Sequence, residues 1–245
     1  MFNPSQQGYI PQISIDCVIF GYQNKQLQVL VSKLNLEGNF MSLAGGFIHQ
    51  NEDVDTAAYR IVQQRMGISE IYLDQFYVFG KASRNNIGFI EKVMELNTST
   101  FQSKSETIQT YDWFNNRFIS IGYYALVDIS SVLPPKDNAN QQTGWYNIKN
   151  MPELIMDHND IVSKALESLR QNLDQKLIAF NLLPETFTMK EVQELYEAIL
   201  DRPFARNNFQ KKILDLGVLQ RLEKKFTGAA NKAPYLYRLK KDNTN

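Results

Sequence analysis

The residues best suited to chemistry lie between Gly45 and Ile68. Two adjacent glycines, Gly45 and Gly46, could let the backbone approach a ligand, or could simply permit a turn. Glu52 and Arg60 follow, and their opposite charges could contact a ligand. We favour a structural pair that fixes the loop on the following helix, because a buried charge needs its partner.

A helix must position these residues. Asp55 or Thr56 could cap its start by accepting a hydrogen bond from a free backbone N–H. Gly67 can end the helix cheaply, because glycine adopts a positive φ without strain. Helical spacing of the apolar residues between these ends predicts one buried stripe, formed by Ala57, Ala58, Ile61 and Val62.

The same stretch resembles the signature of the Nudix hydrolases, which runs Gly, five residues, Glu, seven residues, Arg-Glu, aliphatic, any, Glu-Glu, any, Gly, aliphatic. The positions that match in register are Gly46, Glu52, Arg60, Val62, Gly67 and Ile68. The resemblance implies a Nudix fold, an α/β/α sandwich built on a mixed sheet. In that family the later glutamates hold Mg²⁺ or Mn²⁺ and help to activate the attacking water.

The departures from the signature concern its chemistry. Ile61, Gln64 and Arg65 replace the three carboxylates. Magnesium prefers carboxylate oxygen, which isoleucine lacks; glutamine is a neutral ligand and arginine repels the ion. We therefore expect no catalytic residue, no metal site and no cofactor. The alternative is a weak nucleotide-diphosphate hydrolase, such as an ADP-ribose pyrophosphatase, with an appended winged helix.

Charge is distributed unevenly along a chain whose formal net charge is zero. Residues 1–201 carry 15 basic and 23 acidic side chains, a net charge of −8. Residues 202–241 carry 11 basic and two acidic ones, a net charge of +9. A basic block on an acidic body predicts a polyanionic partner for that block.

Compartment and membrane contact follow from simpler features. The single cysteine, Cys17, lies in an apolar run and is expected to be a buried small hydrophobe in a reducing compartment. The N-terminus lacks the basic and apolar regions of a signal peptide. No apolar run reaches the roughly 18 residues of a membrane span. We expect a cytoplasmic protein without membrane contact.

Strand patterns surround the signature stretch. Ile13–Phe20 and Leu27–Val31 predict a hairpin, and Ile71–Phe79, Arg117–Asp128 and Trp145–Ile148 predict further strands. Residues 85–116 are polar for much of their length and indicate an insertion or mobile loop, either a lid or partner contact or, as we favour, a tolerated surface insertion.

Three further side chains are candidate ligand contacts. Arg84 and Arg117 flank the insertion and could bind a phosphate or a sugar hydroxyl, because a guanidinium donates bidentately. A solvated surface role is favoured for Arg84 and less so for Arg117. His158 follows Asp157 in the first turn of an amphipathic helix that Asp157 could cap.

The C-terminal pattern changes after residues 171–176, which look like a linker. Thr188 and Glu191 fit a capping box, and two helices followed by two basic strands predict a winged helix-turn-helix. Asparagine and glutamine can read adenine, and arginine and lysine can read guanine. The candidate DNA-binding residues are Arg202, Arg206, Asn207, Gln210, Lys211, Lys224, Lys225 and Lys232.

Taken together, these features resemble the Nudix-related transcriptional regulators, the group that includes NAD-metabolism repressors and arabinose-responsive regulators. Besides the degenerate signature, the resemblance rests on Phe118–Leu126, the pair Asp157-His158 and Asn181–Pro184. It implies a homodimer that binds operator DNA and senses a sugar such as arabinose or an ADP-ribose-like nucleotide. We expect a sensor domain over 1–176 and a DNA-binding domain over 177–245. A third possibility is an adaptor whose winged helix contacts protein.

Overall fold

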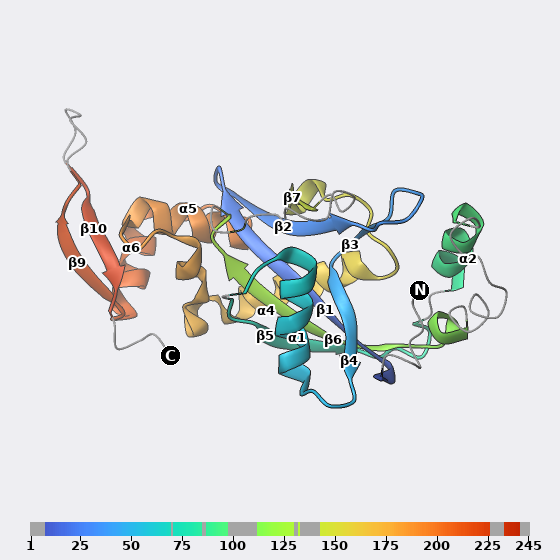
Figure 1. Ribbon diagram of the computed structural model, residues 1–245. Coiled ribbons are helices and arrows are strands. Elements are labelled where there is room, and N and C mark those ends of the chain that lie inside the picture. The colour runs from blue at the N-terminus through green and yellow to red at the C-terminus, as the bar shows by residue number, and fades with distance from the viewer. Residues whose placement is uncertain are drawn as a thin grey trace.

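A computed structural model shows a mixed sheet with a smaller helical and stranded unit at one end (Figure 1). The structure describes residues 8–69, 71–84, 87–97, 112–129, 132, 143–225 and 233–240, without the side chains of Ile87, Lys176 and Ile178. Lys232 and much of the predicted insertion lie outside the described residues. None of the described helices is long and apolar enough to cross a membrane.

The long strand β1 (Tyr9–Gln23) is the centre of the first sheet. The sheet order is β3-β2-β1-β6-β5, with β4 also paired to β1 and β7 to β2. β1 pairs parallel to β6 and antiparallel to β2, so the sheet is mixed, as the sequence predicted. The remaining strands are β2 (Gln26–Lys33), β3 (Met41–Ser42), β4 (Ala44–His49), β5 (Asp74–Phe79), β6 (Ile119–Val127) and β7 (Thr143–Asn147).

Helices cover both faces of this sheet because alternate residues of β1 point to opposite sides. Ile15, Cys17 and Ile19 pack in one apolar cluster with α1 (Val54–Met66). Val18 and Phe20 pack in another with α4 (His158–Lys176). The α/β/α arrangement and the buried Cys17 therefore match the prediction.

The signature helix α1 keeps the predicted stripe and end. Ala57, Ala58, Ile61 and Val62 are buried, and Gly67 has a φ of 72°. The predicted start at Asp55 or Thr56 was wrong by two or three residues, since Asp53 holds the N-cap position. The side chain of Asp55 instead accepts a hydrogen bond from the hydroxyl of Tyr123.

The segment predicted as an inserted loop contains the helix α2 (Ile87–Leu96). Ile90 and Val93 of α2 are buried, at helical spacing. The Ser/Thr-rich part of the segment indicated a loop, although this apolar run precedes it. Residues 98–111 lie outside the described part of the chain.

The second unit is a winged helix joined closely to α4. Its elements are β8 (Phe187–Thr188), α5 (Met189–Leu200), α6 (Arg206–Asp215), β9 (Leu219–Lys224) and β10 (Tyr235–Leu239). Two short 3₁₀ helices flank α4 in the chain: η2 (Ile148–Asn150) precedes it and η3 (Ile178–Leu182) follows it. The predicted capping box of Thr188 and Glu191 is present. β8 adds a third strand to the two that the sequence predicted.

The predicted linker at residues 171–176 is wrong, because these residues form the last turns of α4. Leu173 is buried there and belongs to a cluster that continues into α5 and α6. Arg170 Nε donates to the carbonyl of Ile199 at 2.7 Å, and Lys212 Nζ lies 2.6 Å from Asp174 Oδ2. The two units thus share a core, and the boundary at 176–177 stays a prediction.

Candidate ligand cavity and DNA-binding surface

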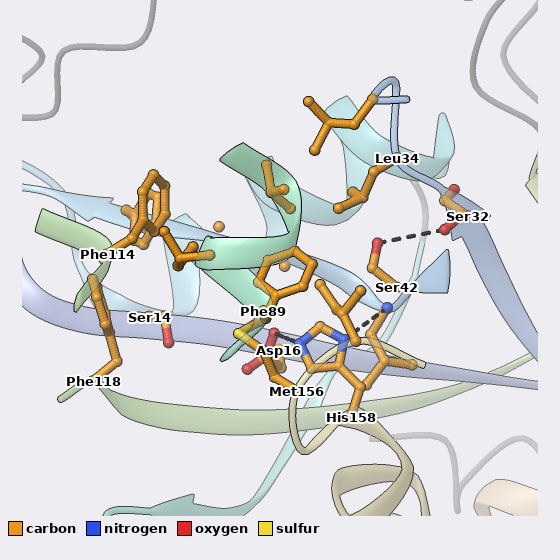
Figure 2. Close-up of a pocket in the computed structure, with 18 of the residues that line it drawn as sticks. Ser14, Asp16, Ser32, Leu34, Ser42, Phe89, Phe114, Phe118, Met156 and His158 are labelled. Atoms are coloured by element: carbon orange, nitrogen blue, oxygen red, sulfur yellow. Dashed lines mark hydrogen bonds and ion pairs between the residues drawn. The ribbon is translucent and has the colours of Figure 1, made fainter. Parts of the chain in front are cut away.

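A cavity of about 370 Å³ lies beside the start of β1, β4 and α2. This volume falls in the range of small-molecule sites, roughly 300–1,000 Å³. Most of the lining is aliphatic or aromatic, with three serine hydroxyls and a few charged or titratable groups. Figure 2 shows Phe114 and Phe118 at one end, Ser32 and Leu34 at the other, and Asp16 and His158 between them.

A buried charge network forms one wall of the cavity. Arg84 Nε donates to Asp157 Oδ2 at 2.6 Å, and Nη2 donates to Asp157 Oδ1 at 3.0 Å. Arg84 Nη2 also lies 3.7 Å from Asp16 Oδ2, which accepts a hydrogen bond from Ser120. Burial alone would raise the pKa of Asp157, but the hydrogen bonds and charge of Arg84 outweigh it and lower the pKa.

His158 completes this wall from the first residue of α4. Its Nδ1 accepts a hydrogen bond from the backbone N–H of Leu43 at 3.1 Å, so the neutral ring carries its proton on Nε2. Nε2 lies 3.5 Å from Asp16 Oδ1. Burial is the largest influence on the pKa of His158 and lowers it, although Asp16 and Asp157 act in the opposite direction. A neutral donor therefore faces the Asp16 carboxylate.

Aromatic rings also line the cavity. The centroid of Phe47 lies 5.6 Å from that of Phe118 and 5.9 Å from that of Phe114. Phe89 of α2 contacts Phe40 edge to face at 5.4 Å. Rings at these separations pack favourably and present flat apolar faces. A planar heterocycle of a ligand would find stacking partners here.

Gly45 and Gly46 both line the cavity, and close packing explains the absence of side chains. A Cβ at Gly45 would lie 2.7 Å from Asp16 Oδ1, and one at Gly46 would lie 2.8 Å from Ile61 Cγ1. Neither glycine has a positive φ. Both glycines lie in the strand β4 rather than in a turn, and the atoms that they approach belong to the protein itself. A contact of their backbone with a ligand stays a prediction.

Glu52 and Arg60 form a structural pair beside the cavity rather than in its lining. Arg60 Nε donates to Glu52 Oε2 at 2.9 Å, and Arg60 Nη2 donates to the carbonyl of Phe47 at 2.8 Å. Glu52 Oε1 accepts from the backbone N–H of His49 at 2.8 Å. The hydrogen bond from Arg60 is the main cause of a lowered pKa for Glu52. These contacts join the loop to α1.

The two arginines that flank the predicted insertion exchange their expected environments. The side chain of Arg84 is only 8% exposed and lines the cavity, so the solvated role favoured for it was wrong. Arg117 is exposed and lies outside the lining. The reason is tertiary: two aspartates distant in sequence surround Arg84. Asp157 holds the N-cap position of α4 but makes no capping bond, because its carboxylate binds Arg84.

Several lining residues escaped the sequence prediction, among them Asp16, Arg65 and the rings of Phe89 and Phe114. Asp16 could have been recognised from the sequence, since a carboxylate inside an apolar strand is rarely buried unless it has a partner. The sequence marked Arg65 only as the residue that replaces a glutamate of the signature. The rings gave no local signal, because they come from segments far apart in the chain.

The winged helix presents a basic surface. Phe209 and Ile213 of α6 are buried, whereas Arg206, Asn207 and Lys211 are exposed, as their spacing predicted. Gln210 is half-buried and less accessible than expected.

The flanking cations are arranged around this helix. Arg202 is exposed and lies over the ring of Phe204 at 5.1 Å. On the wing, Lys224 is half-buried and lies 5.4 Å from the ring of Tyr235. Lys225 Nζ lies 3.6 Å from Glu191 Oε1. Arg202 and Lys225 therefore remain accessible to a polyanion, while Lys224 is partly covered.

Comparison with known proteins identifies this second unit. The family described as the NrtR DNA-binding winged helix domain matches residues 179–239. This chain resembles NrtR. It combines a Nudix-like domain with a C-terminal winged helix domain of the NrtR DNA-binding type.

The similarity to known proteins extends over nearly the full length of this chain. An Acinetobacter baylyi protein named ADPR responsive transcriptional repressor NtrR is 23% identical over 235 residues, which cover 93% of this chain and 82% of the relative. The crystal structure of Shewanella oneidensis NrtR complexed with a 27mer DNA has a TM-score of 0.69 at 21% identity and covers 95% of each chain. A MutT/nudix family protein from Enterococcus faecalis has a TM-score of 0.65 at 18% identity, covering 97% of this chain and 91% of its own.

Proposed function

We propose that this NrtR-like protein is a DNA-binding transcriptional repressor that responds to ADP-ribose or a closely related nucleotide. The observation that carries the proposal is the exposed basic face of α6 on a winged helix of the NrtR type. The Acinetobacter baylyi relative is named for a response to ADPR and for repression. The relative from Shewanella oneidensis was crystallised in complex with a 27mer DNA.

The cavity is the proposed effector site. Its volume of about 370 Å³ and its aromatic wall suit a nucleotide whose base stacks on phenylalanine rings. Asp16 offers a carboxylate that can accept hydrogen bonds from ribose hydroxyls. None of the relatives reported above is named for arabinose or another free sugar, so the nucleotide is the effector we propose.

Repression and release would follow if the effector had different affinities for two arrangements of the protein, one that can bind DNA and one that cannot. An effector shifts a population only if it binds the DNA-incompetent arrangement more tightly. Helix α4 connects the two sites, since His158 at its start borders the cavity and Asp174 near its end contacts Lys212 of α6. We propose that the working unit is a homodimer, because two-fold helix-turn-helix proteins bind two half-sites about one helical turn apart.

The first test separates base reading from phosphate binding. A preferred duplex is selected from a random 27-base-pair library with the full-length protein, and binding is then titrated by fluorescence anisotropy at several salt concentrations. Asn207→Ala should weaken the selected duplex by about 1–3 kcal/mol and a scrambled duplex much less. Lys225→Ala should weaken both duplexes similarly and reduce the salt slope by about one unit. Equal binding of all duplexes by the unmodified protein would refute sequence-specific repression.

The second test concerns the effector and the assembly. ADP-ribose added to the complex with the selected duplex should release the DNA, whereas arabinose and adenosine serve as controls. Light scattering should show a dimer at micromolar concentration, and a monomer both with and without DNA would contradict the proposed assembly.

The hydrolase alternative is tested separately. We propose that the Nudix-like domain does not turn over ADP-ribose, because Ile61, Gln64 and Arg65 replace the carboxylates that would hold the metal. Formation of AMP is followed with Mg²⁺ and with Mn²⁺, using an ordinary Nudix hydrolase as the positive control. Turnover comparable to that enzyme would favour the pyrophosphatase.

A further inference from the structure

Three arginines lie on or beside the effector cavity, and two of them are already neutralised. Arg60 binds Glu52 through two nitrogens and also donates to Gln64. Arg84 binds both oxygens of Asp157 and lies near Asp16. A guanidinium that is paired in this way has little remaining capacity for an added anion.

Arg65 differs from both. It lines the cavity from the last turn of α1, and its side chain is exposed. Within the described part of the chain, Arg65 forms neither a hydrogen bond nor an ion pair. Its five N–H groups are therefore available to a ligand, and their planar fork matches phosphate oxygens bidentately.

The charge balance of the cavity makes this arginine decisive. Asp16 and Asp157 together carry two negative charges against the single positive charge of Arg84, and the buried His158 is neutral. Asp157 pairs with Arg84 but does not line the cavity, so Asp16 and Arg84 offset each other in the lining, and without Arg65 no unpaired cation among the described residues would face a diphosphate. The guanidinium of Arg65 adds positive charge where an anionic group can reach it.

We propose that Arg65 is the anion anchor of the cavity and binds the diphosphate of the effector directly, without a metal ion. The inference rests on the proposed function for the choice of ADP-ribose as ligand. It goes further by naming the residue that holds the diphosphate. It also explains how α1 can bind a diphosphate after losing its carboxylates, since the substitution inverts the charge at position 65.

The experiment measures binding to the full chain by titration calorimetry, in EDTA and again with Mg²⁺. The probes are ADP-ribose, inorganic pyrophosphate and adenosine, which lacks phosphate. The variants are Arg65→Gln, the charge-conserving Arg65→Lys, and Arg117→Gln as an exposed arginine outside the cavity. Because Arg65 is exposed, equal thermal unfolding of all variants is the expected check on folding.

The unmodified protein should bind ADP-ribose equally well in EDTA and in Mg²⁺. Arg65→Gln should weaken ADP-ribose about 10- to 100-fold, which corresponds to the loss of charged hydrogen bonds. Arg65→Lys should retain part of the affinity, and Arg117→Gln all of it. Adenosine should bind the Gln variant and the unmodified protein alike.

The outcomes distinguish this inference from the proposed function. If ADP-ribose binds but Arg65→Gln leaves its affinity unchanged, or if binding requires Mg²⁺, the anchor is refuted and the effector stands. If ADP-ribose does not bind but pyrophosphate binds through Arg65, the effector proposal fails and the anchor stands. Failure of both probes to bind overturns both.

Discussion

Replacing Arg84 with leucine tests how far the cavity depends on its buried charge network. The side chain of Arg84 is 8% exposed and bridges the strand β1 to the start of α4 through Asp16 and Asp157. It also donates to the carbonyl of Phe118 at 3.0 Å. Leucine retains apolar bulk but removes every donor, which leaves two carboxylates without their partner.

The expected loss of stability is large. Removing one partner of a buried ion pair typically destabilises a protein by about 3–5 kcal/mol, since an uncompensated charge remains. Asp157 is 28% exposed and can recover some hydration. We therefore expect the low end, about 3 kcal/mol at pH 7. Arg84→Lys keeps the charge but loses the bidentate geometry, so its loss should be smaller.

The loss should also depend on pH. In the unmodified protein Arg84 lowers the pKa of Asp157, so its contribution is present above the unfolded pKa of about 3.9 and is lost as pH falls through the folded value. Without Arg84, burial raises the pKa of Asp157 instead. The difference in stability between the two proteins should therefore begin to shrink above pH 4, as pH falls through the raised pKa of Asp157 in the variant, and should shrink further below about 4 as the contribution of Arg84 is lost.

The assay is urea unfolding at pH 7 and at several lower pH values, with midpoints and slopes compared. Arg117→Leu is the control, because an exposed arginine should change stability by no more than about 0.5 kcal/mol. Equal losses for Arg84→Leu and Arg117→Leu would refute the reasoning. A loss that persists unchanged at low pH would show that packing, rather than charge, governs the site.

Two further predictions concern the same cavity. Burial lowers the pKa of His158, so the unfolded chain binds more protons than the folded one at mildly acid pH. His158→Gln should therefore flatten the fall in stability as pH drops below about 6.5. If urea unfolding at several pH values gave the same dependence of stability on pH for both proteins, the buried neutral ring would be contradicted. Gly46→Ala should destabilise by about 1–3 kcal/mol because its Cβ meets Ile61 at 2.8 Å. Gly88→Ala in α2, with nothing within 4 Å, should stabilise by roughly 0.5–1 kcal/mol, and equal effects of both substitutions in thermal unfolding would count against this packing argument.

Periodicity and local chemistry accounted for the elements that depend on near neighbours. The stripe of α1, the stop at Gly67 and the capping box at Thr188 each involve residues a few positions apart. The loop-to-helix pair of Glu52 and Arg60 was predictable for the same reason, since only eight residues separate them.

The same local reading failed where a remote partner decided the outcome. The end of α4 was taken for a linker because its polar residues are conspicuous, whereas Leu173 is buried against the winged helix. Arg84 was given a surface role because its partners lie 73 and 68 positions away. α2 was overlooked because a polar stretch follows it in the chain.

The sequence by itself determined the architecture: a Nudix-like domain, a winged helix, and a basic face on the second helix of that unit. It did so because fixed gaps between glycines, caps and apolar residues are enforced by backbone geometry within each element. The tertiary structure alone decided which charges are neutralised. Ion pairing depends on distances between strands and helices that no local spacing specifies, and it leaves Arg65, rather than Arg60 or Arg84, facing the cavity as the available cation.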